Sequence, residues 1–469
     1  MTQEKKYDLV VLGAGPGGYV SAIRAAQSGL KAAIIEKEKV GGVCLNRGCI
    51  PSKALIKNAE IVSVIKKASE FGITYDNLKI DYSVAVKRSQ EAVSRLTQGV
   101  EFLLKKHKVD LIMGRGIIRT PQSLMVESKT DQKEIQTQNI IIATGSRARS
   151  LPGIEMDGQL VMSSTEALLL TRLPENLLIV GGGAVGVEFA YIFSSYGVRV
   201  TLIEVESSLL PREDAEIGQT LGKAFSKQKI EVKTGCQLGA LKEENGKALA
   251  QLLSKDKEEM KVFERVLMAT GRTPNSENIG LDQIGVKTQK GFIQVNPFMQ
   301  TSVLNVYAIG DVAGKALLAH TAMAEGMTAV EKILGKDPPP FDYLSIPNCV
   351  YCQPQVASMG YTEKSAVEKG YKVKIGMFPY RANGKAVAIG ETDGFVKLVT
   401  DAETEELLGA HLIGVDASEH ISELVLARRL EATAGEIART VHPHPTLSEA
   451  IMEASEDVFG KAIHIWKGN

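Results

Sequence analysis

The sequence lacks the features of several specialised protein classes. Five cysteines in 469 residues are too few for an extracellular disulfide framework. No run of about 18 apolar residues is present, so we expect no membrane span. The 55 Lys and Arg balance the 55 Asp and Glu, and no basic stripe indicates nucleic acid as a partner. Residues 1–7 are polar and contain no apolar signal region, which favours a cytoplasmic protein. The length of 469 residues indicates two to four domains.

Two of the five cysteines, Cys44 and Cys49, lie in the segment 41–53, which reads Gly-Gly-Val-Cys-Leu-Asn-Arg-Gly-Cys-Ile-Pro-Ser-Lys. An ideal helix would separate them by about 7.5 Å along its axis, and a disulfide needs Cα atoms closer than about 7 Å. A bond therefore requires a distorted turn, for which Gly48 provides freedom. A helix predicted over 53–71 favours a thiolate at Cys49. The pattern indicates a redox pair, although two buried thiols that never bond would also satisfy it.

The N-terminal segment has the order of a dinucleotide-binding unit. A strand at 7–13, a glycine-rich loop, a helix to about residue 28 and a strand at 31–36 follow one another. In such units the first glycine makes a tight turn, the second lets the backbone approach a pyrophosphate, and the third allows close packing. The acid that ends the second strand accepts hydrogen bonds from ribose. These positions are Gly13, Gly15, Gly18 and Glu36.

The same order recurs over residues 177–204, with the same spacing from the first glycine to the acid. The corresponding positions are Gly181, Gly183, Gly186 and Glu204. Two turn-rich loops would rarely match in every one of these respects, so both units are predicted to bind dinucleotides. Glu204 favours NAD over NADP, because a carboxylate repels a 2′-phosphate and residues 205–207 contain no arginine. The first unit is predicted to hold FAD, because only it is followed at once by the cysteine pair and a flavin can exchange electrons with thiols.

Two apolar strands ending in Ala-Thr-Gly, at 139–145 and 265–271, bracket the second unit, and a Pro-rich linker covers 336–347. We therefore predict an α/β protein with two Rossmann-like dinucleotide-binding domains, the second inserted into the first, and an α+β C-terminal domain. Its predicted strands lie near 350–359, 372–380, 395–400 and 407–413, and its helices near 420–430 and 447–459. The predicted segments are an FAD domain at 1–147, an NAD domain at 148–271, a return to the FAD domain at 272–342 and the C-terminal domain at 343–469.

The segment 41–53 resembles the active-disulfide motif of the flavoprotein disulfide reductases, in the form found in members that act on dihydrolipoyl groups. The segment 442–449, His-Pro-His-Pro-Thr-Leu-Ser-Glu, is similar to the family's active-site base motif. The segment 306–311, Val-Tyr-Ala-Ile-Gly-Asp, is similar to its second FAD fingerprint. The chain departs from the family at Val43, where Thr is usual, and at Gln355, where Glu is usual.

The resemblance implies which residues form the site. The catalytic set is Cys44, Cys49, Lys53, Glu188, His444 and Glu449. The expected FAD contacts are Gly13, Gly15, Gly18, Glu36, Gly42, Lys53, Gly116, Thr144, Gly145, Asp311, Ala319 and His320. The expected NAD contacts are Gly181, Gly183, Gly186, Glu188, Glu204 and Gly271.

Within the base motif, the resemblance makes His444 the base and Glu449 its partner, and His442 is the weaker candidate. From spacing alone, Glu449 would also serve as the capping-box acid of a last helix capped by Thr446. Asp311 would likewise serve as the cap of a turn. We expect a cis His444–Pro445 peptide bond. Cys349 and Cys352 have CxxC spacing but no further ligands for zinc, so we predict isolated thiols and no metal.

The resemblance implies a cytoplasmic homodimer with tightly but non-covalently bound FAD and with NAD+/NADH, in which the base reaches the disulfide of the other subunit. It implies oxidation of dihydrolipoyl groups on an acyltransferase or H-protein type partner of a 2-oxoacid dehydrogenase or glycine-cleavage complex. One alternative is a glutathione-type reductase, which should have arginines after Glu204. Another is a mercuric reductase, which should end in a vicinal cysteine pair, whereas this chain ends Ile-Trp-Lys-Gly-Asn. A flavin-bearing scaffold or redox sensor is a third.

Overall fold

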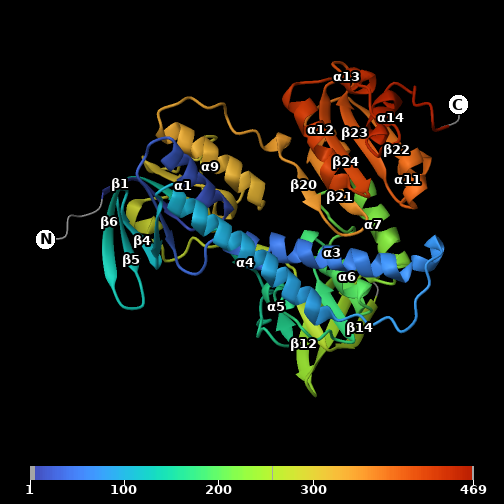
Figure 1. The fold of residues 1–469 in the computed structure, drawn as a ribbon, viewed down its shortest axis with the longest axis horizontal. Coiled ribbons are helices and arrows are strands. Elements are labelled where there is room, and N and C mark those ends of the chain that lie inside the picture. The colour runs from blue at the N-terminus through green and yellow to red at the C-terminus, as the bar shows by residue number, and fades with distance from the viewer. Residues whose placement is uncertain (1–5, 256, 467–469) are drawn as a thin grey trace. The chain divides into compact units, whose positions relative to one another are not determined.

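A computed structural model describes residues 6–255 and 257–466 (Figure 1). The described chain separates into two compact units. Unit 1 comprises residues 6–54, 83–149 and 271–341, and unit 2 comprises 55–82, 150–270 and 342–466. The limits near 149, 270 and 341 fall close to the predicted ends of the FAD and NAD segments. The four-segment division itself stays a prediction, because unit 2 joins the second nucleotide-binding segment and the C-terminal segment.

Unit 1 is built on a seven-stranded sheet with the order β3-β2-β1-β6-β5-β4, and β19 pairs with β6. The parallel part contains β1 (Lys6–Leu12), β2 (Ala32–Glu36), β3 (Asp110–Met113), β6 (Gln132–Ile142) and β19 (Val306–Ala308). Two antiparallel strands, β4 (Arg115–Thr120) and β5 (Ser123–Glu127), extend it.

Strand β1 is apolar on both faces because the sheet is covered on both sides. Leu9 and Val11 pack into one core cluster, and Val10 and Leu12 pack into the other. The first cluster includes residues of α1 (Pro16–Gln27) and α9 (Ala319–Ile333), two helices that lie side by side (Figure 1). The parallel strands therefore end together, and Gly13 and Glu36 come to the same edge of the sheet.

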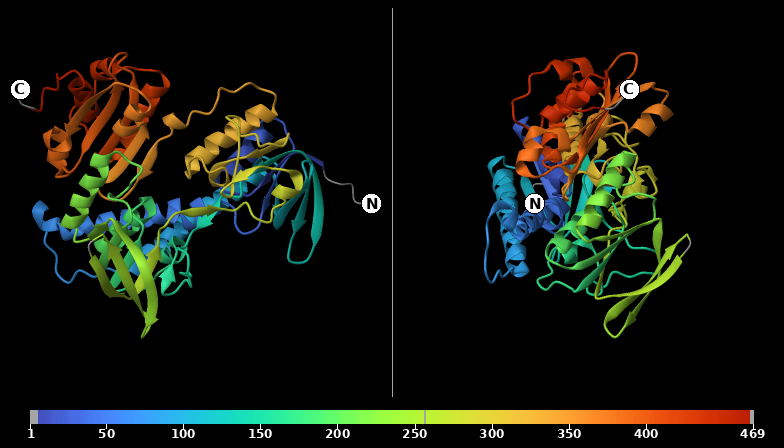
Figure 2. Two further views of the ribbon diagram at one scale, coloured as in Figure 1. Left: turned by 180° about the vertical axis from the view of Figure 1, so that it is seen from behind. Right: turned by 90° about the vertical axis from the view of Figure 1, so that its right-hand side faces the viewer.

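Unit 2 contains a second parallel sheet, with the order β11-β10-β9-β15-β8. Its strands are β8 (Val161–Met162), β9 (Asn176–Val180), β10 (Arg199–Glu204), β11 (Glu231–Thr234) and β15 (Arg265–Met268). Helix α6 (Ala184–Ser195) joins β9 to β10, and α7 (Ala215–Lys227) joins β10 to β11. An antiparallel sheet of β12 (Cys236–Glu244), β13 (Lys247–Ser254) and β14 (Lys257–Phe263) follows, and it is the yellow-green sheet of Figure 2.

The C-terminal part of unit 2 is an antiparallel sheet with the order β20-β21-β24-β23-β22. Its strands are β20 (Asn348–Val350), β21 (Gln355–Gly360), β22 (Val373–Pro379), β23 (Phe395–Asp401) and β24 (Leu407–Gly414). Helices α12 (Ala417–Arg429), α13 (Ala434–Arg439) and α14 (Glu449–Asp457) follow the last strand. None of the helices in the described part of the chain is long and apolar enough to cross a membrane.

Several predicted elements were wrong in detail. The strand predicted over 350–359 is two strands, because a turn with a cis Gln353–Pro354 bond separates them and proline cannot donate to a ladder. The helix predicted over 53–71 is α3 (Cys49–Lys66) followed by a 3₁₀ turn at Ala68–Phe71. Helix α13 was not predicted, although Thr433 and Glu436 form a capping box at its start.

Candidate functional site

The two glycine-rich loops have nearly the same geometry. Gly13 and Gly181 have φ angles of 108° and 111°, a conformation that favours glycine. A Cβ on Gly18 would lie 1.9 Å from the Gly13 oxygen, and one on Gly186 would lie 1.8 Å from the Gly181 oxygen. These four glycines are therefore required by the backbone itself.

The middle glycine of each loop, Gly15 or Gly183, is not required by a backbone clash, and the space in front of it explains its presence instead. Gly183 caps α6, and a Cβ there would meet no atom within 4 Å. Gly15 caps α1, and its Cβ would approach only Gly42 Cα, at 3.9 Å. Neither helix has a side-chain cap or an acidic residue in its first turn. Open space faces two N-termini whose amides no side chain caps, and this cradle fits a pyrophosphate.

Glu36 and Glu204, the acids that end the second strand of each dinucleotide-binding unit, make the same kind of hydrogen bonds. Glu36 accepts hydrogen bonds from Ala14 N at 2.7 Å and Glu38 N at 2.8 Å. Glu204 accepts from Gly182 N at 2.6 Å and Glu206 N at 2.9 Å. Each carboxylate thus holds its glycine loop in place, and the remaining lone pairs are available to a ribose.

In unit 1 the candidate cofactor site has further polar groups. Within the described part of the chain, Thr144 Oγ1 and Thr321 Oγ1 are buried without a hydrogen-bond partner, which fits a polar ligand that supplies one. Gly145 leaves open space, whereas a Cβ on Gly116, in β4, would lie 2.4 Å from Leu12 Cδ1. Packing therefore explains Gly116, and its contact with FAD stays a prediction.

The remaining predicted FAD contacts also belong to unit 1. Gly42 is close to Gly15, because its Cβ would lie 2.7 Å from Gly15 Cα. Ala319 and His320 are the first residues of α9, a helix without a side-chain cap. Gly271, a predicted NAD contact, belongs to unit 1 as well.

Asp311 is held by two residues that sequence reasoning missed. Ser146 Oγ donates to Asp311 Oδ2, and Arg272 Nε lies 3.4 Å from the same oxygen. Arg272 also donates to Ser146 Oγ at 2.6 Å and to its carbonyl at 2.8 Å. Each of the two residues directly follows one of the Ala-Thr-Gly repeats. The strands that begin there, β7 (Ser146–Ala148) and β16 (Arg272–Pro274), pair with each other, so the repeat was the signal that could have found them.

The structure brings the two cysteines into contact, and the disulfide between them stays a prediction. Cys44 lies in α2 (Gly42–Arg47), Cys49 begins α3, and Gly48 interrupts the helix between them. The two residues are thiols that share a hydrogen bond, with no disulfide between them. This hydrogen bond and burial raise the pKa of Cys44, while the charge of Lys53 works to lower it. Cys44 therefore keeps its proton when the pair carries a single negative charge.

The proposed base pair lies in unit 2. His444 Nδ1 is 2.8 Å from Glu449 Oε1, and the His444 side chain is 77% exposed, so its other ring nitrogen is accessible. Burial works to raise the pKa of Glu449, but hydrogen bonds from Thr446 N and His444 outweigh it and lower that pKa. The His444–Pro445 bond is cis, which confirms the prediction.

The capping-box prediction at Thr446 was wrong. Helix α14 begins at Glu449 with Ser448 as its N-cap, and Thr446 Oγ1 donates to Pro443 O at 2.7 Å. Only half of the predicted pattern is present, namely the bond from Thr446 N to Glu449 Oε2 at 2.8 Å. Glu449 is therefore free to use its other oxygen on His444.

Glu188 and Lys53 were predicted to act together. Glu188, on α6 in unit 2, is buried and accepts a hydrogen bond from Tyr351 N at 3.0 Å. Lys53 belongs to unit 1. Their pairing stays a prediction.

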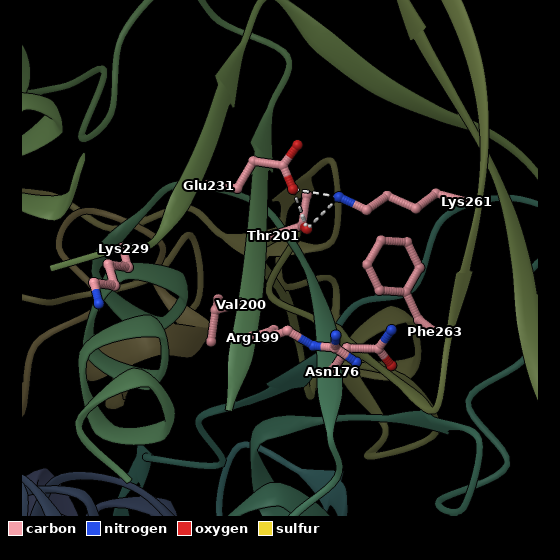
Figure 3. A pocket seen from close by; sticks show the side chains of 8 residues that line it. All are labelled: Asn176, Arg199, Val200, Thr201, Lys229, Glu231, Lys261 and Phe263. Atoms are coloured by element: carbon pink, nitrogen blue, oxygen red, sulfur yellow. Dashed lines mark hydrogen bonds and ion pairs between the residues drawn. The ribbon is translucent and has the colours of Figure 1, made fainter. Parts of the chain in front are cut away.

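One cavity of about 370 Å³ lies in unit 2 away from the glycine loop. Asn176 and Arg199, the first residues of β9 and β10, line it, whereas Gly181 and Glu204 lie at the opposite ends of these strands. Lys261 reaches Glu231 and Thr201 across it (Figure 3). Dinucleotides bind at the carboxyl ends of parallel strands, so this cavity is not the predicted NAD site.

The comparisons with known proteins agree with this geometry. A family model described as pyridine nucleotide-disulphide oxidoreductase matches residues 7–326, and the dimerisation domain of the same family matches 346–455. The dihydrolipoyl dehydrogenase of Corynebacterium glutamicum is 46% identical over 98% of this chain and 99% of its own. That of Zymomonas mobilis is 44% identical with the same coverage.

Solved structures are also similar over nearly the whole chain. LpdA from Mycobacterium tuberculosis has a TM-score of 0.89 at 25% identity, covering 96% of this chain and 99% of its own. The flavoprotein disulfide reductase RclA from Escherichia coli, in a Cu(II) complex, has a TM-score of 0.86 at 27% identity with the same coverage.

Proposed function

The chain belongs to the pyridine nucleotide-disulphide oxidoreductase family, and on this premise we propose that it oxidises dihydrolipoyl groups with NAD+ as the acceptor. The hydrogen-bonded cysteine pair, in which Cys44 is held protonated, carries this proposal. The near-full-length similarity to dihydrolipoyl dehydrogenases supports the choice of substrate. The enzyme is an FAD-dependent oxidoreductase that uses NAD(H).

The loop of Gly13, Gly15 and Gly18 would hold FAD, with Asp311 and the two unpartnered threonines beside it. The loop of Gly181, Gly183 and Gly186 would hold NAD+, with Glu204 at its ribose. Bound FAD supplies a relay for two electrons between the cysteine pair and NAD+.

The chemistry balances as a dithiol–disulfide exchange followed by hydride loss. His444 takes a proton from the dihydrolipoyl thiol, and the thiolate attacks Cys44 in the oxidised pair. The Cys44–Cys49 bond breaks and a mixed disulfide forms. The second lipoyl sulfur then closes the lipoyl disulfide and leaves the two cysteines reduced. Two electrons and one proton reach NAD+ as a hydride equivalent, and one proton is released.

Glu449 gives His444 its orientation, because the carboxylate accepts a hydrogen bond from Nδ1–H of the ring and thereby directs Nε2 outward. The lowered pKa of Glu449 keeps this carboxylate ionised. In the proposed homodimer, the base of one subunit serves the cysteine pair of the other. The dimerisation-domain match supports the dimer, and so do large exposed apolar side chains that a second copy would cover. These are Leu430, Val441, Ile463 and Trp466.

The proposed partner is a lipoyl-bearing acyltransferase or H-protein of a 2-oxoacid dehydrogenase or glycine-cleavage complex. The proposed location is the cytoplasm, because five cysteines in 469 residues are too few for an extracellular disulfide framework.

Steady-state oxidation of dihydrolipoamide by purified protein tests the proposal. We expect NADH formation with NAD+ and at least tenfold lower kcat/KM with NADP+, because Glu204 faces the ribose. The matched variants Cys44→Ser and Cys49→Ser should each abolish this activity, whereas Cys236→Ser, a buried cysteine of β12, should retain it. Activity with glutathione disulfide and NADPH but not with dihydrolipoamide would contradict the proposal.

A further inference from the structure

His442 is the inward-pointing residue of an exposed segment that leads to the base. Residues 441, 443, 444 and 445 are exposed, and Val441 reaches 92%. The side chain of His442 is only 4% exposed. The segment 441–445 therefore has one buried anchor, two residues before His444.

Both ring nitrogens of His442 are engaged. Nδ1 lies 2.9 Å from the carbonyl oxygen of Thr440, the C-cap residue of α13. Nε2 lies 2.8 Å from Glu423 Oε1 on α12. The ring thus links the end of one helix to the face of another.

Both partners of this ring can only accept hydrogen bonds. A neutral imidazole has one N–H and would direct a lone pair at the second acceptor. The two contacts are satisfied together only by the imidazolium, which has two donors. The hydrogen bond to Glu423 raises the pKa of His442 against the effect of burial, and the Thr440 carbonyl and the charge of Glu449 act in the same direction.

The other charged groups around this pair are compatible with a cation at His442. His420, on α12, also faces Glu423, but burial lowers the pKa of His420. Glu449, on α14, faces the ring as well, and the positive charge of His442 is one cause of the lowered pKa of Glu449. His442 is therefore the histidine that pairs with Glu423 as a cation.

The rest of the segment is fixed on the far side of the base. Asn383 Nδ2 donates to Thr446 O at 3.0 Å, and Thr446 Oγ1 donates to Pro443 O at 2.7 Å. His444 is thus held between this cluster and His442, and Glu449 orients its ring. Loss of the His442 contacts or of the Asn383–Thr446 contact would let the His444 imidazole move relative to a thiol bound by the partner subunit.

We propose that His442, as an imidazolium held between Thr440 and Glu423, is a positioning residue that fixes the segment carrying the base His444. The inference rests on the proposed function, since it takes His444 as the group that deprotonates the dithiol. His442 itself touches no substrate and transfers no proton.

The protonation state is tested first, in the intact dimer. Spectra of protein labelled with ¹⁵N-histidine should show His442 with both nitrogens protonated at pH 7, and a titration should place its pKa above 6.5. Glu423→Gln, which keeps the shape of the side chain but removes its charge, should lower that pKa. A single neutral tautomer at pH 7 in the wild type would overturn the proposal, whatever the enzyme's activity.

Kinetics then tests the positioning role. His442→Gln should lower kcat for dihydrolipoamide about 10- to 100-fold, the effect of a displacement of about 1 Å at a reacting group, with KM for NAD+ unchanged. NADH oxidation by ferricyanide, which needs no thiol deprotonation, should be retained and shows that the variant is folded. His107→Gln, after the end of α4 (Tyr82–Lys106) in unit 1, is the matched control and should match the wild type.

The pH profile separates positioning from simple stability. Because the pKa of His442 is raised by folding, its two hydrogen bonds to Thr440 and Glu423 are both present below its pKa in the unfolded chain. They are lost as the pH rises through its pKa in the folded protein. Glu423→Gln should therefore move the alkaline decline of kcat to lower pH. Full kcat and an unchanged profile in both variants would refute the proposal. Absence of wild-type activity with dihydrolipoamide would instead refute the proposed function, and the NMR result would still stand.

Discussion

The change Gly183→Ala separates binding from folding at the second glycine loop. Gly183 has φ −75° and ψ −176°, which alanine adopts without strain, and a Cβ there would meet no atom within 4 Å. Alanine caps a helix less well than glycine by about 0.5–1 kcal/mol, and it gains about 0.4–1 kcal/mol from the unfolded chain. We therefore expect the free energy of unfolding to change by less than about 1 kcal/mol.

The same methyl group should be costly when NAD+ binds. It would occupy the space in front of the α6 N-terminus, where the pyrophosphate would accept hydrogen bonds from the amides. A hydrogen bond to a charged group contributes about 1.5–3 kcal/mol, and the helix dipole adds about 0.3–1 kcal/mol. Loss of one such contact corresponds to a rise in the Kd for NADH of roughly 20- to 700-fold.

The assay is NADH titration by fluorescence together with urea denaturation. Gly186→Ala is the contrasting variant, because its Cβ would lie 1.8 Å from the Gly181 oxygen. It should lose about 1–3 kcal/mol of stability or more. Gly222→Ala, inside α7 with open space around it, should bind NADH normally and gain up to about 1 kcal/mol. Wild-type affinity in Gly183→Ala, or a loss of stability equal to that of Gly186→Ala, would refute the reasoning.

Three further predictions concern single side chains. His444→Gln should lower kcat with dihydrolipoamide by about 10²- to 10⁴-fold, and Glu449→Gln should lower it less, because the base remains; equal losses in steady-state assays would contradict this order. The lowered pKa of Glu449 means stability that is present above its ordinary value of 4.5 and lost as the pH falls through the folded value. The stability advantage of wild type over Glu449→Gln, measured by denaturation, should therefore shrink from pH 7 to pH 3. Lys397→Met should cost about 3–5 kcal/mol in urea denaturation, because it leaves the buried carboxylate of Asp214 without its cation; a stability equal to wild type would show that this acid is neutral.

The sequence was a good guide where a local pattern determines local structure. The glycine spacing fixed both nucleotide loops, because a Cβ at the first and third positions would clash with the loop's own backbone or the next strand. The cysteine contact followed from the conformational freedom of Gly48, which interrupts the helix between the two cysteines. Family resemblance was needed for His444, since spacing alone also allowed Glu449 to be a helix cap.

Long-range polar contacts could not be predicted in this way. Lys397 lies in the otherwise apolar strand β23 and is 1% exposed. Its ammonium is 2.8 Å from Asp214 and 3.0 Å from Glu216, both at the start of α7, and 2.8 Å from Glu363, which lies in a segment far from them in the chain. Nothing local in the sequence marks this lysine as buried. For Ser146 and Arg272 the repeated Ala-Thr-Gly was a local signal, but it did not identify Asp311 as their partner, because Asp311 is distant in the chain.

The similarity of the two glycine loops shows what a fingerprint can and cannot specify. In each loop the terminal acid accepts two backbone N–H groups, so much of the pattern serves to build the turn. Such a turn binds a dinucleotide but does not choose which one. The choice must come from groups outside the fingerprint. In unit 1 these groups include Thr144 and Thr321, whose hydroxyls are buried without a hydrogen-bond partner among the described residues. A ligand that supplies a partner to these hydroxyls would gain affinity at the first site, and the reason for expecting a flavin there is that only this loop is followed at once by the cysteine pair.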